Sequence, residues 1–155
     1  MSKLSHVGED GRARMVDVSG KAATHRVATA AGYLRCRIET LDLVRAGTTP
    51  KGAVIQTAEL AGTMAAKRTA DLIPLCHPLA LTKVTVTIAA DDALPGFRIA
   101  AEVGSHGVTG VEMEALTAVA VAGLTLFDML KAVDRTMEIG GMKVTGKTGG
   151  KSGTW

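Results

Sequence analysis

The sequence predicts an α+β fold in which an antiparallel sheet carries two long helices on one face. Segments that alternate apolar and polar residues indicate strands, and two longer segments with apolar residues at helical spacing indicate helices. A turn at Leu94-Pro95-Gly96 separates two neighbouring strand segments, as in a hairpin. The order strand, helix, strand, strand, helix, strand is that of the ferredoxin-like sandwich. With 155 residues, 46% of them hydrophobic, the chain can form one domain with a sizeable core.

The chain begins with a polar, glycine-containing segment, residues 1–14, which we expect to be a mobile arm. Residues 15–155 are predicted to form the single domain, including a C-terminal tail rich in glycine and lysine. A first strand is predicted over Tyr33–Ile38, because apolar and polar side chains alternate there, with Gly32 as a β-bulge. A short helix should follow over Glu39–Arg45.

A second helix is predicted after Gly47, where the short helix ends. Thr49-Pro50 has the composition of a helix cap followed by a first-turn proline. Small and apolar residues then recur at helical spacing from Val54 to Ala65. We expect this helix to end between residues 68 and 72, ahead of Pro74.

The second half of the chain contains the hairpin, a long helix and a last strand. Alternating residues over Lys83–Ile88 and Phe97–Val103 predict the two hairpin strands. The long helix is predicted over Glu112–Asp134, and the last strand over Met137–Thr145. Because Ala115–Phe127 is apolar on nearly every side, this helix needs a second covering surface, and we expect a partner subunit to supply it through helices and sheet.

Composition excludes several classes of protein. A net charge of +3 with only 3% aromatic residues does not fit a nucleic-acid-binding protein. The N-terminal residues contain no apolar core of a secretory signal, and the apolar stretch Ala115–Phe127 is too short for the roughly 20 residues of a membrane span. Two cysteines make no disulfide framework, so we expect a cytoplasmic protein.

The segment Gly141–Thr148 matches the phosphate-binding pattern GxxxxGK[ST] letter for letter. We reject a P-loop NTPase, because the pattern needs a helix after it and only seven residues remain. The tail still combines glycines with Lys143, Lys147 and Lys151 and lacks acidic residues. The sequence supports two interpretations of the tail equally: a solvated, disordered terminus, or a segment that binds an anion.

The stretch Asp71–Leu79 is the strongest local motif, since Pro74 and Pro78 bracket the adjacent Cys76 and His77. The prolines bias the residues before them to extended geometry and stiffen the segment. A rigidly held histidine suits proton transfer or anion contact, and the alternative is a buried histidine in a loop-closing segment.

Carboxylates and lysines mark both ends of the long helix. Glu112 and Glu114 open it, where they complement the helix dipole or act as acid and base. Asp128 and Lys131 share a face further along, and Lys51 precedes the other long helix. Glu114 and Asp128 are fourteen residues apart, about 21 Å along a straight helix. If both are catalytic, we prefer a pocket shared between two subunits.

Taken together, the motifs resemble the cyclic pyranopterin monophosphate synthase family, the accessory protein C of molybdenum-cofactor biosynthesis. The resemblance runs from about Met15 to Gly153 and rests on these segments, in order: Met15–Ser19, Ala66–Thr69, Leu72–Leu79, Thr109–Thr117, Asp128–Asp134 and Lys147–Gly153. It implies a ferredoxin-like homohexamer, a trimer of dimers, with active sites at the dimer interface. It also implies a lyase that converts 3',8-cyclo-7,8-dihydroguanosine 5'-triphosphate to cyclic pyranopterin monophosphate and releases pyrophosphate.

The resemblance also assigns residues. Substrate contacts fall on Leu75, Cys76, His77, Met113 and Glu114, and functional positions on Lys51, Glu112, Asp128, Lys131 and Lys147. Of the functional positions, we expect Lys51, Asp128 and Lys131 to be catalytic, Glu112 to bind the guanine edge and Lys147 to bind phosphate. Arg26 is a further candidate for phosphate binding. The spacing of histidines and cysteines encodes no metal site, and the sequence requires no cofactor, although Mg²⁺ could accompany the triphosphate.

The chain departs from the pattern of similar sequences at three positions. Val108 stands where a basic residue is usual, Ala53 where an acid is common, and Thr148 where a serine is usual. None is a residue assigned to chemistry, but the loss of a cation at Val108 leaves an alternative open. That alternative is a non-catalytic oligomer that binds nucleotides or phosphate, or a divergent paralogue.

Overall fold

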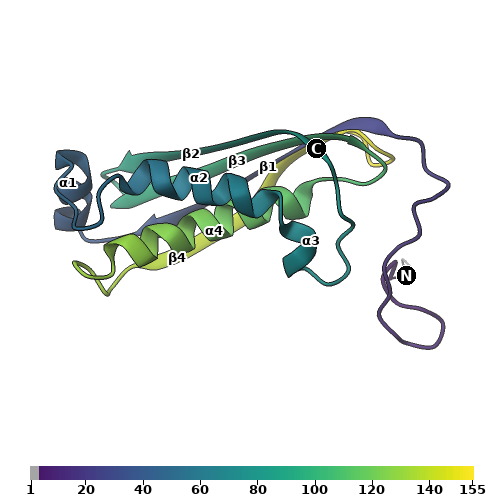
Figure 1. The fold of residues 1–155 in the computed structure, drawn as a ribbon, viewed down its shortest axis with the longest axis horizontal. Helices are drawn as coiled ribbons and strands as arrows, with labels where there is room; N and C mark the ends of the chain where they lie inside the picture. The colour runs from purple at the N-terminus through teal and green to yellow at the C-terminus, as the bar shows by residue number, and fades with distance from the viewer. Residues whose placement is uncertain (1–3) are drawn as a thin grey trace.

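The computed structural model describes residues 4–155 as a four-stranded sheet with helices on one face (Figure 1). The strands are β1 (Thr24–Arg35), β2 (Leu81–Asp91), β3 (Gly96–Gly107) and β4 (Glu138–Thr148), and the helices are α1 (Ile38–Ala46), α2 (Val54–Ala66), α3 (Thr69–Leu72) and α4 (Glu112–Leu130). The strand order is β2-β3-β1-β4, and every neighbouring pair is antiparallel. This is the predicted ferredoxin-like sandwich, so the predicted fold class is confirmed.

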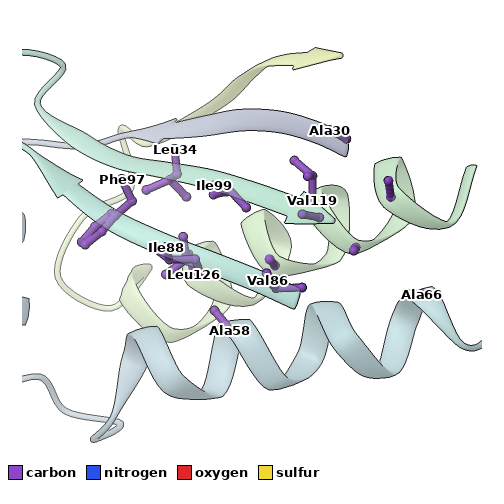
Figure 2. Close-up of a cluster of buried hydrophobic side chains, with 14 of the residues drawn as sticks. Ala30, Leu34, Ala58, Ala66, Val86, Ile88, Phe97, Ile99, Val119 and Leu126 are labelled. Carbon is purple, nitrogen blue, oxygen red and sulfur yellow. The ribbon is translucent and has the colours of Figure 1, made fainter. Parts of the chain in front are cut away.

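The core lies between the sheet and the two long helices, as Figure 2 shows. Alternate residues of β1 and β3 point to the helices, among them Leu34 and Ile99, which are fully buried. Much of the core is alanine, which lets the helices approach closely. At Gly62 of α2 a Cβ atom would lie 2.8 Å from the carbonyl oxygen of Ala118 in α4. The small residues of this core therefore let the backbones of α2 and α4 approach closely at Gly62.

Helix α4 is the central element of the core. Its length and its mean hydropathy of 1.6 would by themselves suffice to cross a membrane, which the count over Ala115–Phe127 did not suggest. However, 56% of that window is buried inside the fold, as in the core helix of a soluble protein. Leu124 is 59% exposed, so one face of α4 remains uncovered in a single chain. That a partner covers it stays a prediction.

Most predicted elements are present, but several boundaries were wrong. Strand β1 begins at Thr24 and ends at Arg35, since the alanine-rich first half carried little strand signal and Ile38 already begins α1. The Thr49-Pro50 cap was also wrong: Thr49 accepts a bond from the Gly52 amide in a turn, and α2 begins only at Val54. The register of β1 and β4 shifts across Gly32, which confirms the predicted bulge.

Two helix ends also differ from the prediction. Helix α2 stops at Ala66, and the separate short helix α3 ends at Leu72, within the range predicted for the end of a single helix. Helix α4 stops at Leu130, four residues before the predicted end at Asp134. Asp134 is instead buried in the following turn, where it accepts hydrogen bonds from the Arg37 amide and the Thr40 hydroxyl. It thereby ties this turn to the start of α1.

The first and last segments of residues 4–155 each fold back on themselves. Residues 1–3 of the predicted arm lie outside the described residues, while Val7 and Ala13 form an isolated β-bridge in an exposed loop. The mobility of the arm stays a prediction. At the other end, Lys147 and Trp155 exchange two backbone hydrogen bonds of 2.7 and 2.9 Å. The pattern Gly141–Thr148 lies in strand β4, so the rejection of a P-loop is confirmed.

Candidate active site

Ionisable side chains gather in two clusters, one at each end of α4. The first, which we call the N-terminal cluster, contains Arg26, Cys76, His77, Glu112, Glu114 and Lys147. The second, the C-terminal cluster, contains Lys51, Asp128 and Lys131. Figure 1 shows the two ends of α4 near α3 and near α1, at opposite ends of the helical layer.

Glu114 is the most buried carboxyl group of the N-terminal cluster, at 3% exposure. The Cys76 thiol donates to its Oε1 at 3.6 Å, while Oε2 is buried without a hydrogen-bond partner among residues 4–155. Burial raises the pKa of Glu114, and the bond from Cys76 offsets part of this rise. A carboxyl group held in this way retains a proton at higher pH than usual and has one oxygen free to bind a ligand.

Cys76 is held as a neutral thiol rather than as a nucleophile. Burial, with the nearby charge of Glu114, raises its pKa to about 11. The Nε2 atom of its neighbour His77 lies 2.6 Å from the carbonyl oxygen of Val16, and this contact fixes the orientation of the ring. Ile73 has the extended backbone predicted for a residue before proline, with φ −106° and ψ 112°. The segment therefore presents Cys76 and His77 rigidly, one toward α4 and one toward the chain before β1.

Lys147 and Glu112 join β4 to the first turn of α4. Their Nζ and Oε1 atoms lie 2.5 Å apart, and both side chains are largely shielded, at 15% and 26% exposure. Glu112 folds back over Gly110, where any Cβ atom would collide with its carboxylate. The glycine before this helix therefore permits the close approach that the ion pair needs.

Arg26 enters the same cluster from β1. Lys147 is the cross-strand partner of Ala28, so Arg26, two residues earlier, lies on the same face of the sheet. The Arg26 side chain is buried at 7% exposure, and its Nε donates to the Gly107 carbonyl at 2.9 Å.

The C-terminal cluster is a carboxylate flanked by two lysines. Lys131 lies 2.8 Å from Asp128 Oδ1 and Lys51 lies 3.3 Å from Oδ2, while Lys51 also donates to the Asp128 carbonyl at 3.2 Å. The hydrogen bonds from Lys131 and then Lys51 lower the pKa of Asp128. All three side chains are about half exposed. Lys51 thus contacts Asp128, although the two residues are 77 positions apart in the chain.

The structure does not bring every predicted residue together. Leu75 is half-buried and Met113 is 39% exposed. Each lies beside the N-terminal cluster because it is adjacent in the chain to a cluster residue, Cys76 for Leu75 and Glu114 for Met113. The two clusters remain apart, because the fourteen residues from Glu114 to Asp128 span about 21 Å within one intact helix.

Sequence reasoning also missed a buried hydroxyl group. Ser105 is the cross-strand partner of Arg26, is 1% exposed, and its Oγ has no hydrogen-bond partner among residues 4–155. No motif surrounds it that could have signalled this position.

Among residues 4–155, no group of three or more His, Cys, Asp or Glu side chains lies close enough together to hold a metal ion. A magnesium ion carried by a triphosphate stays a prediction. The two clusters have the features of an enzyme's active site, since they pair carboxyl groups with lysines and leave the buried Oε2 of Glu114 unpaired among residues 4–155.

Comparison with known proteins identifies the family. The sequence model of the MoaC family matches residues 15–150. Three similar proteins, each named cyclic pyranopterin monophosphate synthase, are 59% identical to this chain. The protein of Jannaschia sp. (strain CCS1) aligns over 99% of this chain and 94% of its own. For Brucella ovis the shares are 99% and 93%, and for Methylobacterium sp. (strain 4-46) they are 100% and 97%. The chain belongs to the MoaC family, which confirms the resemblance found in its motifs.

Proposed function

We propose that this chain is a lyase of molybdenum-cofactor biosynthesis that converts 3',8-cyclo-7,8-dihydroguanosine 5'-triphosphate to cyclic pyranopterin monophosphate. Family membership over residues 15–150 and relatives of this name at 59% identity support the proposal. The reaction opens and recloses rings, forms a cyclic phosphate and releases pyrophosphate. It therefore needs proton donors and acceptors together with cations for phosphate.

The C-terminal cluster fits the proton transfers. Asp128 holds Lys51 and Lys131 side by side, so that one ammonium group can donate a proton while the other binds the substrate. Because the pKa of Asp128 is lowered, it stays ionised at neutral pH and keeps both lysines in place.

The N-terminal cluster fits recognition of the base and the phosphates. Glu112 and Glu114 offer carboxyl oxygens to the N–H groups of a guanine-like ring. The Oε2 atom of Glu114, buried without a partner in the described part of the chain, is the strongest single observation for a bound ligand. Lys147 and Arg26 offer the cations for phosphate, with His77 as a third donor.

The distance between the clusters supports a shared active site. A separation of about 21 Å is too long for one compact pocket in one chain. We therefore propose that the N-terminal cluster of one copy meets the C-terminal cluster of another, in a homohexamer built as a trimer of dimers. We place this assembly in the cytoplasm.

The test is turnover of the purified protein with the cyclised dihydro-GTP, following pyrophosphate and cyclic pyranopterin monophosphate. We expect both products in equal amounts. If a divalent cation only accompanies the triphosphate and is not required, adding a chelator should leave this result unchanged. Binding of substrate without product would overturn the proposal. That result would favour the non-catalytic alternative, for which the missing cation at Val108 is the one specific observation.

A further inference from the structure

Asp134 is a buried carboxylate that the proposed proton transfers do not use. It is 1% exposed, and both of its oxygens accept hydrogen bonds. Oδ2 accepts the Arg37 amide at 3.0 Å and the Thr40 hydroxyl at 2.9 Å. Oδ1 accepts the amide and the hydroxyl of Thr136 at 2.8 and 2.7 Å. Because a buried charge is tolerated only with such partners, these four residues are held in one arrangement, which we call the Asp134 clamp.

The clamp closes the turn that carries Lys131. Lys131 is the C-terminal cap residue of α4. The Asp134 amide donates to the Leu130 carbonyl at 3.0 Å, so Lys131 lies inside a closed turn that ends at the clamp. Arg37 adds a second link, since its Nη2 donates to the Val133 carbonyl at 2.6 Å. The backbone that carries Lys131 is therefore fixed from outside α4 as well as from within it.

The same clamp holds the start of α1, the helix that leads to Lys51. Arg37 is the N-cap residue of α1 and makes no side-chain capping bond, whereas the Asp134 carboxylate binds this helix end from across the fold. Helix α1 has nine residues, too few to be stable in isolation, so its position depends on tertiary contacts of this kind. A turn closed by the Gly52 amide on the Thr49 carbonyl then presents Lys51.

The C-terminal cluster by itself does not supply this order. Lys131 and Lys51 lie 2.8 and 3.3 Å from Asp128, but all three side chains are about half exposed. Ion pairs at that exposure fix a geometry weakly, because they are screened and because long side chains lose entropy when they are held. Proton transfer nevertheless needs closely placed donors, and a displacement of about 1 Å can cost about a hundredfold in rate.

The placement of the two lysines must therefore come from the backbone segments that carry them. One segment is the turn after α4, and the other is α1 with the turn that follows it. Figure 1 shows α1 and the end of α4 at the same end of the molecule, and the clamp is the buried polar contact that joins them.

We propose that Asp134 is a positioning residue of the active site, which holds Lys131 and Lys51 at the separation that the proton transfers require. It acts through these two lysines and does not contact the substrate. The proposal rests on the proposed function, and it adds to that function a buried residue outside both clusters.

The test compares Asp134→Asn with the control Asp91→Asn. Asparagine keeps the shape of the side chain but replaces one acceptor oxygen with a donor that faces the donors of the clamp. Asp91 is a matched carboxylate, since it accepts the amides of Ala93 and Leu94 in the turn between β2 and β3 and lies outside both clusters. Urea unfolding establishes conditions in which both variants are folded.

Two measurements are made under those conditions. With the cyclised dihydro-GTP, kcat of Asp134→Asn should fall at least about tenfold while KM stays within about twofold, because the binding groups of the N-terminal cluster are intact. Hydrogen exchange without substrate, followed by mass spectrometry, should be faster than in wild type over residues 47–53 and 128–134. The control should match wild type in kcat, in KM and in the exchange of both segments.

The outcomes separate this proposal from the proposed function. Wild-type kcat in folded Asp134→Asn would overturn the positioning role and leave the proposed function intact. Unchanged exchange in either segment would also overturn it, since the clamp would then not hold that segment. An equal fall in kcat for Asp91→Asn would overturn it too, because a general loss of stability would then explain the effect. If wild type gives no product, the proposed function fails, and the exchange alone decides whether Asp134 holds the two lysine segments.

Discussion

The two clusters of the active site can be inactivated in separate copies of the chain. Lys131→Ala removes a lysine from the C-terminal cluster, and Lys147→Met removes one from the N-terminal cluster while keeping an apolar stem. Lys131 is about half exposed and lies outside the core, so we expect the first variant to fold normally. Lys147 pairs with Glu112 at a partly shielded site, so the fold of the second is checked by circular dichroism.

The structure sets the expected magnitude. Because about 21 Å separate the clusters in one chain, a shared site takes each cluster from a different copy. In a mixed dimer with two-fold symmetry, one site then carries both substitutions and the other carries neither. Random mixing makes about half of the dimers mixed, so the mixture should regain about one quarter of wild-type activity.

The assay is pyrophosphate release by each variant alone and by the two variants coexpressed in equal amounts. Each variant alone should be nearly inactive. A mixture that stays as inactive as the separate variants would refute the shared site, because a site within one chain is damaged in every copy. Mixing two C-terminal-cluster variants, Lys131→Ala and Asp128→Ala, provides the control and should restore nothing.

Three further predictions concern stability and reactivity. Burial would raise the pKa of Asp134, but hydrogen bonds from the Arg37 amide and its other partners hold this pKa at about 2. The carboxylate therefore stabilises the fold by about 2 kcal/mol above pH 4 and loses that effect as the pH falls toward 2. Urea unfolding of Asp134→Asn should lack this pH dependence. Gly62→Ala should lower the free energy of unfolding by about 1–3 kcal/mol, the cost of overpacking, although alanine has the better helix propensity. The reason is that the new Cβ atom would lie 2.8 Å from the Ala118 carbonyl oxygen. Gly123→Ala should cost less, because the nearest atom to its Cβ is in a side chain, at 3.3 Å. Cys76, with a pKa of about 11, should react with iodoacetamide at pH 8 far more slowly than free glutathione, and faster alkylation would contradict its assignment as a neutral thiol.

Local signals predicted much of the fold because they are periodic. The alternation in β2 and β3 and the helical spacing in α2 and α4 all correspond to observed elements. Errors fell where local chemistry is ambiguous: Thr49-Pro50 resembles a helix cap, but its turn is completed by Gly52. The end of α4 was misjudged because Asp134 has no local signal for the partners that it meets at α1.

The sequence by itself determined the order of elements, the resemblance of the motifs to one family and the residue types available for chemistry, since periodicity and motif spacing are properties of neighbouring residues. Only the tertiary structure decided which of them meet. It brought Lys51 to Asp128 and buried Oε2 of Glu114 without a partner among residues 4–155. The physical reason is that pairing and burial depend on residues far apart in the chain, which no local pattern records.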